Sequence, residues 1–201
     1  RFAYYLLKEI IPHVDYAIDF HAGGASRFNA AQIRIIPDNK ELKDLADVFH
    51  APFTLYSKNI SGSFRNSCHK LGVKMLLFEG GKSNDFNDEI TLQGVEGAKR
   101  ILHQFDMLNG RKKTHIPEDK SIYINKSSWI RAKYSGMFHG HTKVGRYVER
   151  GDLLATISDP YGKIEHRLKA PNSGYIINVN DAPIVYQGDA IYHISTSLSN
   201  E

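Results

Sequence analysis

The sequence VKMLLFEGG, residues 73–81, gives the most direct indication of the fold class. Residues 73–79 form a near-continuous apolar run, which is typical of a strand that is buried on both faces. Such strands occur in parallel or mixed sheets whose two faces are covered by helices. The run ends at Glu79, and two glycines follow it directly. The stretch therefore predicts an inner strand of an α/β sheet that carries an ionisable side chain at its end.

The residues on both sides of this strand alternate between helical and extended patterns. Helices are predicted over residues 2–11, 41–50, 63–72 and 89–108, and further strands over residues 14–20, 31–37 and 53–57. Strands that alternate with helices predict an α/β domain with a mostly parallel or mixed sheet. We place this domain at residues 1–109.

Residues 110–120 are polar and charged, which predicts a linker. After this segment the sequence changes to short extended patterns and glycine turns, without a convincing helix. We therefore expect a second, small all-β domain at residues 121–201.

This second region contains an internal repeat. VERGDLLATIS at 148–158 aligns with VYQGDAIYHIS at 185–195, and RAKYSGMF at 131–138 aligns with KAPNSGYI at 169–176. The Gly-Asp pair in each copy predicts a tight turn. Two copies of one turn–strand–turn unit predict a β domain with pseudo-twofold symmetry. Over residues 121–196 the pattern resembles the barrel-sandwich hybrid of biotinyl and lipoyl carrier domains.

The composition and charge of the chain indicate which classes of partner and which cellular compartment to expect. The chain has 201 residues, a net charge of +4 at pH 7 and a single cysteine, Cys68. The charge is modest and spread along the chain, and no apolar run is long enough to cross a membrane, so neither a nucleic-acid nor a membrane partner is expected. A single cysteine fits a reducing compartment, and we expect a cytoplasmic protein. The chain opens on a helical pattern without Met, so we expect it to be a piece of a longer protein.

His21 and Glu79 are chemically capable residues at the ends of predicted strands. Ligands of open α/β sheets bind beyond the carboxyl ends of strands, so both side chains are candidates for a site. Imidazole is a common zinc ligand, and Asp19 lies two residues back on the same face of the strand, where it could orient a ligand. A strand-end carboxylate could act as a general base. From the residues alone, purely structural roles for His21 and Glu79 also remain open, because one histidine does not make a zinc site.

Two motifs and their order carry a family resemblance. DFHAGG at 19–24 and KMLLFEGG at 74–81, followed by a long helix and a β domain with a Gly-Asp repeat, resemble the succinylglutamate desuccinylase/aspartoacylase family. This family is a branch of the zinc carboxypeptidase-like hydrolases. The resemblance covers nearly the whole chain and implies the C-terminal portion of such an enzyme. The implied fold is a mixed sheet flanked by helices, with its N-terminal part missing, followed by a barrel-sandwich-hybrid-like domain.

The resemblance also implies a site and a reaction. One zinc ion would have three protein ligands, of which His21 is one, and the His-x-x-Glu pair that supplies the other two is expected upstream of Arg1. Glu79 is implied to activate the zinc-bound water as general base and then to protonate the leaving amine, with Asp19 as a supporting residue. The implied reaction is the hydrolysis of an N-acyl amide bond by a zinc-dependent deacylase. Because two ligands are expected elsewhere, the isolated chain could be inactive.

Substrates of this family carry carboxylates, which arginine side chains grip through paired hydrogen bonds. Arg27 in the loop after His21 and Arg34 on the next strand are the nearest arginines in the sequence, and Asn29 could add a hydrogen bond. The expected partner is a small N-acyl amino acid or a related compound. A homo-oligomer is compatible with the resemblance.

Two other functions remain open at this stage. The β domain could be a carrier or binding module, because Lys163 lies near the hairpin between the two repeats, where carrier domains bear a modified lysine. Its neighbours Gly162 and Ile164 differ from the residues expected around such a lysine. Alternatively, the same two-domain scaffold has lost catalysis and only binds ligands.

Overall fold

The structure, a computed structural model, describes residues 2–108 and 117–199, which form two compact units. The first, the α/β unit, consists of residues 1–21, 31–79 and 88–123, within the described part of the chain. The second, the β unit, consists of residues 22–30, 80–87 and 124–201, again as far as they are described. Most of the predicted linker at 110–120 lies outside the described residues.

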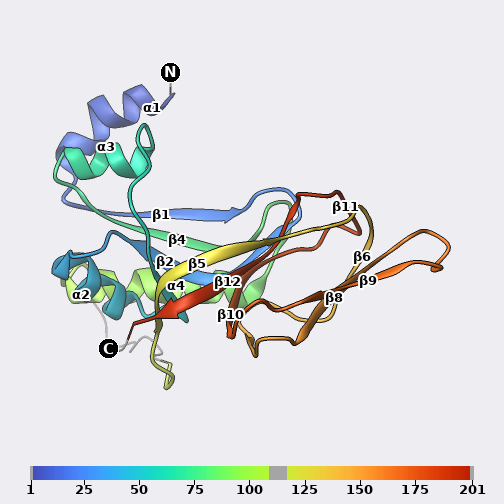
Figure 1. Ribbon diagram of the computed structural model, residues 1–201. Helices are drawn as coiled ribbons and strands as arrows, with labels where there is room; N and C mark the ends of the chain where they lie inside the picture. Colours follow the sequence, from blue (N-terminus) through green and yellow to red (C-terminus); the bar gives the residue numbers. More distant parts are fainter. Residues whose placement is uncertain (1, 109–116, 200–201) are drawn as a thin grey trace. The chain divides into compact units, whose positions relative to one another are not determined.

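Every helix and strand predicted for the first region is present, with shifted boundaries (Figure 1). The helices are α1 (Phe2–Tyr5), the π-helix η1 (Leu6–Ile10), the 3-10 helix η2 (Ile11–His13), α2 (Lys40–Phe49), α3 (Phe64–Lys70) and α4 (Asp88–Gln104). The strands are β1 (Tyr16–Gly23), β2 (Arg27–Ile35), β3 (Phe53–Tyr56) and β4 (Lys74–Lys82). Their order in the α/β unit is β1-β4-β2-β3, and β2 runs parallel to β3.

Helices cover both faces of these strands. On one face, the apolar stripe of α2 and the buried side of α4 pack against Ile33, Ile35 and Leu76. On the other face, α3 and the η1–η2 segment pack against the first residues of β1 and β4. Figure 1 shows α2 and α4 on one side of the strands of this unit and α1 and α3 on the other. The mixed α/β fold expected from the sequence is therefore confirmed.

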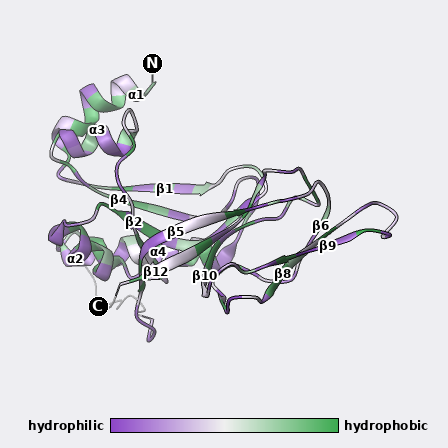
Figure 2. Cartoon of the chain, in the orientation of Figure 1, coloured by the Kyte–Doolittle hydropathy of each residue, from purple (hydrophilic) through white to green (hydrophobic). Residues whose placement is uncertain are grey.

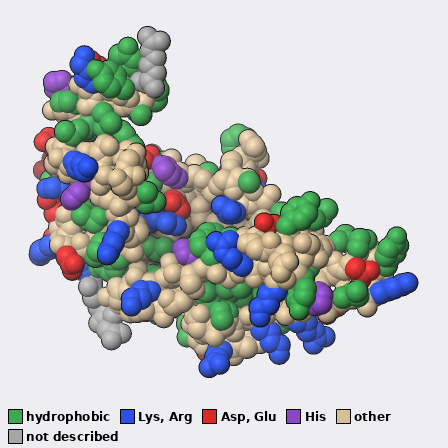
Figure 3. Space-filling view, turned by 45° about the horizontal axis from the view of Figure 1, so that its top comes forward, with side chains coloured by type: hydrophobic (Ala, Val, Ile, Leu, Met, Phe, Trp, Pro, Cys, Tyr) green, Lys and Arg blue, Asp and Glu red, His purple; other side chains and the backbone are tan. Residues whose placement is uncertain are grey.

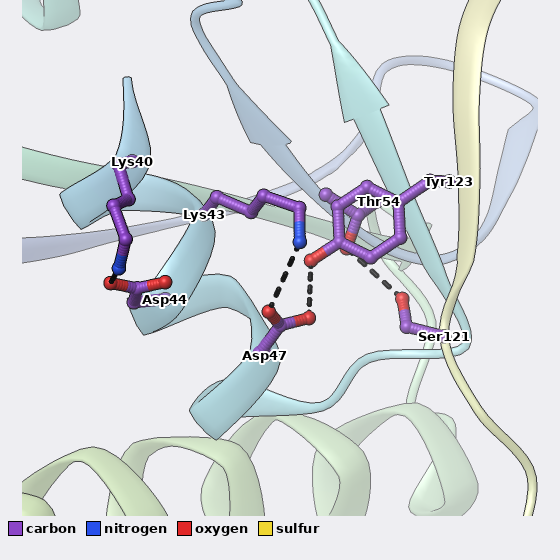
Figure 4. Close-up of polar contacts among 7 residues, drawn as sticks. All are labelled: Lys40, Lys43, Asp44, Asp47, Thr54, Ser121 and Tyr123. Atoms are coloured by element: carbon purple, nitrogen blue, oxygen red, sulfur yellow. Dashed lines mark hydrogen bonds and ion pairs between the residues drawn. The ribbon is translucent and has the colours of Figure 1, made fainter. Parts of the chain in front are cut away.

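The beginning of β5 (Ile122–Arg131) is attached to the α/β unit by polar contacts (Figure 4). The Tyr123 hydroxyl donates to Asp47 Oδ1 at 2.5 Å, and Ser121 Oγ lies 3.0 Å from Thr54 Oγ1. Burial and the hydrogen bond to Asp47 raise the pKa of Tyr123, so its hydroxyl stays protonated and remains a donor. These contacts place residues 121–123 in the first unit.

The β unit continues with short strands, and the structure describes no helix between residues 117 and 199. They are β6 (Gly136–Gly140), β7 (Tyr147–Val148), β8 (Leu153–Ser158), β9 (Glu165–Lys169), β10 (Gly174–Asn180), β11 (Ile184–Val185) and β12 (Ala190–Leu198). Their neighbours follow the orders β5-β12-β10-β7 and β11-β6-β8-β9. Hydrophobic residues lie along β8 and β10 (Figure 2). Leu154 of β8, Ile176 of β10 and Ile191 of β12 belong to one hydrophobic core.

The internal repeat of the sequence is repeated in the hydrogen bonds of the β unit. At the second turn, Gly188 N–H donates to Ala132 O at 2.8 Å and Gln187 N–H donates to Ser135 Oγ at 2.9 Å. The first turn makes the same contacts with the other Ala-x-x-Ser-Gly segment: Gly151 N–H donates to Ala170 O and Arg150 N–H to Ser173 Oγ, both at 2.9 Å. Each copy therefore docks on the turn of the other, as an interlocked pair.

The aspartates of the two turns make equivalent contacts and provide a paired test of this symmetry. Asp152 Oδ2 accepts from Glu149 N–H and Asp189 Oδ2 accepts from Tyr186 N–H, both at 2.9 Å. Replacing either aspartate with alanine should lower the free energy of unfolding by about 1 kcal/mol, because one backbone donor loses its acceptor. Replacement with asparagine, which keeps an acceptor oxygen, is the control and should cost clearly less. Urea denaturation curves measure both; unequal losses at the two turns would contradict the equivalence.

The surface mixes charged and hydrophobic side chains. Figure 3 shows Lys and Arg side chains gathering over the end of the β unit that carries β6, β8 and β9. Exposed aromatic residues lie there too: the Tyr134 ring stacks on His166 of β9, with 3.6 Å between ring centroids. Among the described residues, no helix is both long and apolar enough to cross a membrane.

Candidate functional site

Side chains of β1 divide between the two faces of the α/β unit. Ile18 packs in the layer of α2 and α4, and the Phe20 ring contacts Phe78 of the same layer. Ala17 packs on the opposite side, with α3. Because successive side chains of a strand point to opposite faces, Asp19 and His21 lie on the α3 face.

The neighbouring strands present two further charged residues on this face. Met75 of β4 packs in the α3 layer, and alternation places Glu79 on the same side. Ile33 and Ile35 of β2 pack on the α2–α4 side, so Arg34 between them points to the α3 face. Strand β4 lies between β1 and β2 in the sheet. The α3 face of three adjacent strands therefore carries a histidine, two carboxylates and an arginine.

Asp19 and His21 form a hydrogen-bonded pair. His21 Nε2 lies 3.0 Å from Asp19 Oδ2, with the two side chains 49% and 27% exposed. When the ring donates to the carboxylate through Nε2, its lone pair lies on Nδ1. Beneath them, Cys68 of α3 is fully buried; burial and then the charge of Asp19 raise the pKa of its thiol. Cys68 is therefore a neutral packing residue, whereas the imidazole of His21 is accessible to solvent.

Glu79 pairs with Arg34. Arg34 Nη2 lies 3.0 Å from Glu79 Oε2, and the side chains are only 24% and 17% exposed. Arg34 Nε is buried and has no hydrogen-bond partner among the described residues. The partial exclusion of water makes this a stronger electrostatic pair than one on the open surface.

Arg65 on α3 is a second cation near this pair, and sequence reasoning missed it. Its guanidinium donates to Ser57 Oγ at 3.1 and 3.2 Å and to Lys58 O at 3.0 Å, which fixes its position. Burial and then the charge of Arg34 lower the pKa of Arg65, whereas the charge of Glu79 raises it. Nothing close to Arg65 in the sequence pointed to the site; the packing of α3 on this face brings it there.

The structure places the other two predicted substrate anchors, Arg27 and Asn29, in the β unit. Asn29 pairs in register with Asn178 of β10, whose Nδ2 donates to Asn29 Oδ1 at 2.6 Å. The Arg27 guanidinium lies 5.6 Å from the centroid of the Trp129 ring. Their closeness to His21 in the sequence was the reason for choosing them. The first half of β2 instead pairs with β10, so both side chains contact residues of the β unit.

His21 and Glu79 lie inside their strands, so the expectation that His21 follows one strand and that Glu79 ends another is wrong. Strand β1 continues to Gly23 and β4 continues to Lys82. At the end of β1, Gly23 permits a close approach of the chain, because a Cβ atom there would lie 1.9 Å from Arg27 O.

A complete metal site is not formed by the described residues: they contain no group of three or more His, Cys, Asp or Glu side chains that could hold a metal ion. The chain does contain one His-x-x-Glu sequence, at residues 115–118, but the resemblance places such a pair upstream of Arg1. His115 lies outside the described residues.

Lys163 lies in the loop between β8 and β9. Asp159 closes this loop, accepting from Ile164 N–H at 2.6 Å and from Tyr161 N–H at 3.2 Å. The Lys163 ammonium lies 6.0 Å from the centroid of the Tyr161 ring. The lysine is thus presented on a closed hairpin between the two repeats.

Comparisons with known proteins place this geometry in context. No family model matches the chain. It is 20% identical over 172 residues to N-alpha-acetyl-L-2,4-diaminobutyric acid deacetylase of Halomonas elongata, and the match covers 79% of this chain and 49% of that protein. The chain therefore spans about half the length of the curated relative it matches.

Solved structures resemble the chain over almost its whole length. The apo structure of the ectoine utilization protein EutE (DoeB) from Ruegeria pomeroyi has a TM-score of 0.84 at 18% identity, covering 98% of this chain and 64% of that one. A succinylglutamate desuccinylase/aspartoacylase from Rhodobacter sphaeroides has a TM-score of 0.83 at 18% identity, covering 98% of this chain and 62% of that one. These likenesses confirm the resemblance seen in the sequence: the chain has the fold of the succinylglutamate desuccinylase/aspartoacylase family.

Proposed function

We propose that the α3 face of the α/β unit is part of the active site of a hydrolase that cleaves the N-acyl amide bond of a small, carboxylate-bearing substrate. The observation that carries this proposal is the gathering of Asp19, His21, Arg34 and Glu79 on one face of three adjacent strands. The similar proteins support the reaction class, since one is described as a deacetylase and another as a desuccinylase/aspartoacylase.

Arg34 and Arg65 would bind and orient the substrate. Guanidinium groups hold carboxylates in a fixed geometry through charge-assisted hydrogen bonds. Arg65 is held by Ser57 and Lys58 O, so it would offer its charge at little entropic cost. Fixing the substrate carboxylate would place the scissile amide near Glu79 for reaction.

Glu79 would move the protons of the reaction. As general base, its carboxylate would take a proton from the attacking water as the new C–O bond forms. The same carboxyl group would then give that proton to the amine nitrogen as the C–N bond breaks. The products are a carboxylic acid and an amine, so atoms and protons balance with water as the only co-reactant.

A zinc ion is the cofactor that fits the chemistry of His21. A metal-binding histidine usually makes a hydrogen bond to a carboxylate through its other ring nitrogen, as His21 does with Asp19. His21 would then hold zinc through Nδ1, with the remaining ligands supplied from outside the described residues. When bound, zinc polarises a carbonyl oxygen and lowers the pKa of water.

Hydrolysis itself tests the proposed function. Purified full-length protein, rather than the isolated chain, is incubated with added zinc and with N-acetyl and N-succinyl amino acids, and amine release is measured. We expect release from substrates with a free carboxylate and clearly less from the same compounds as carboxamides. No release from any compound would favour the alternative that the scaffold only binds ligands. Intact mass measurement tests the carrier alternative, which requires a covalent group on Lys163.

Residue-resolved zinc binding tests the role of His21 separately from activity. We expect zinc to shift the imidazole NMR signals of His21 and a His21→Ala variant to lose this binding. Asp19→Asn should weaken binding at His21 about tenfold, because the supporting carboxylate is lost. Asp152→Asn in the β unit is the matched control and should change nothing. If zinc shifts only His139 and His141, whose rings lie 4.8 Å apart in the β unit, the assignment of His21 is wrong.

A further inference from the structure

The pair of Arg34 and Glu79 uses only part of what an arginine can offer a carboxylate. One nitrogen, Nη2, contacts one oxygen, Oε2, at 3.0 Å. An arginine fork can instead make two parallel hydrogen bonds to both oxygens of a carboxylate, which is the stronger arrangement. Because Arg34 Nε has no acceptor among the described residues, the fork through Nε and Nη2 is not formed with Glu79.

The nitrogen that would complete the fork is left without an acceptor. Arg34 Nε is buried and, within the described residues, no oxygen accepts from it. A buried donor that has lost water and gained no partner is destabilising. A carboxylate that accepted from both Nε and Nη2 would give this buried donor its missing partner. The arrangement with Glu79 is therefore less favourable than a forked pair with another carboxylate.

The local charge favours a second anion. Arg34 and Arg65 both lie near Glu79, so two guanidinium charges face this carboxylate. Asp19, the other carboxylate of the α3 face, is paired with His21. Arg65 is held by Ser57 and by Lys58 O rather than by an acidic side chain. One further negative charge would neutralise this group.

We infer that Arg34 exchanges its partner: it holds Glu79 in the resting state and transfers to the carboxylate of an arriving ligand, which releases Glu79. The inference rests on the proposed function, in which Glu79 is the general base. A Glu79 carboxylate that is paired with a cation is a weaker base, so its release from Arg34 would make it available to take a proton. Arg34 is then a positioning residue that couples ligand binding to the availability of Glu79. A ligand without a carboxylate would leave the pair closed.

A titration with acetate tests the exchange without any catalytic turnover. The probe is the Arg34 Nε–Hε cross-peak in a nitrogen–proton NMR spectrum, assigned by its loss in an Arg34→Lys variant. We expect acetate to shift this peak with a saturable curve, whereas neutral acetamide and sodium chloride of equal ionic strength do not. A peak that stays in place with acetate, or moves equally with acetamide, would overturn the inference.

Removing the resting partner should strengthen acetate binding. In Glu79→Gln no carboxylate competes for Arg34, so the acetate affinity should rise about fivefold, the equivalent of about 1 kcal/mol of lost competition. Glu165→Gln is the matched control, because Glu165 pairs with Arg167 at 3.4 Å in the β unit, and it should leave the affinity unchanged. Unchanged or weaker acetate binding in Glu79→Gln contradicts the exchange. Amide hydrolysis by the wild-type protein is scored separately, so either idea can fail alone.

Discussion

Replacing Glu79 with glutamine should lower kcat for N-acyl amide hydrolysis about 10³-fold, which is within the range for loss of a general base. Glutamine has the size of glutamate and keeps an acceptor oxygen, but it cannot take a proton from water. Because Arg34 would then be free for the substrate, KM for a carboxylate-bearing substrate should fall or stay the same. The expected signature is thus a loss confined to kcat.

Steady-state kinetics with a substrate cleaved by the wild-type protein measure this effect. The Glu165→Gln variant, which removes a carboxylate from another Arg–Glu pair, is the control and should keep wild-type kcat. Circular dichroism and the urea midpoint show whether Glu79→Gln remains folded. A folded variant that retains wild-type kcat would remove Glu79 from the mechanism and with it the main chemical support of the proposed function.

The two glycines of DFHAGG should respond very differently to alanine. A Cβ atom on Gly23 would lie 1.9 Å from Arg27 O and 3.0 Å from Gly81 O, and both are backbone atoms that cannot move alone. We expect Gly23→Ala to lower the free energy of unfolding by about 3 kcal/mol, at the upper end for overpacking. Gly24→Ala places its Cβ where no atom lies within 4 Å and should be almost neutral.

Urea denaturation of the two variants, side by side with the wild type, gives the comparison. The pair is closely matched, because the substitutions are chemically identical and occupy adjacent positions. Equal effects at both positions would mean that the close approach at Gly23 does not exist in solution. If Gly23→Ala is too unstable to purify while Gly24→Ala is normal, the prediction holds in its strongest form.

The sequence predicted the elements well because their periodicities are local. The apolar run at 73–79 corresponds to β4 in the structure, and the amphipathic pattern at 41–50 corresponds to α2. Leu42, Leu45 and Phe49 of α2 are buried. The repeat at 148–158 and 185–195 also survived as paired turns. In each case, a pattern of a few residues contains the physical reason for the element, namely which side chains one face must bury.

The candidate site was predicted less completely because it depends on contacts between distant residues. Alternation along β1 was enough to pair Asp19 with His21. Arg65 was missed, since only the packing of α3 brings it near Glu79, and Arg27 was assigned to the site because nearness in sequence was the only guide. The first residues of β2 belong to the β unit because they pair with β10. No local sequence pattern around Arg27 predicts this pairing.

The interlocked turns of the β unit imply an order of events during synthesis. The turn at Gly151 closes on Ala170, a short way along the chain, whereas the turn at Gly188 closes on Ala132, which emerges from the ribosome long before it. Closing a long loop costs more entropy and is slower than closing a short one. We therefore expect the contact between Gly151 and Ala170 to form first, and the contact between Gly188 and Ala132 to form later. The two copies have equivalent structures but would fold at different times.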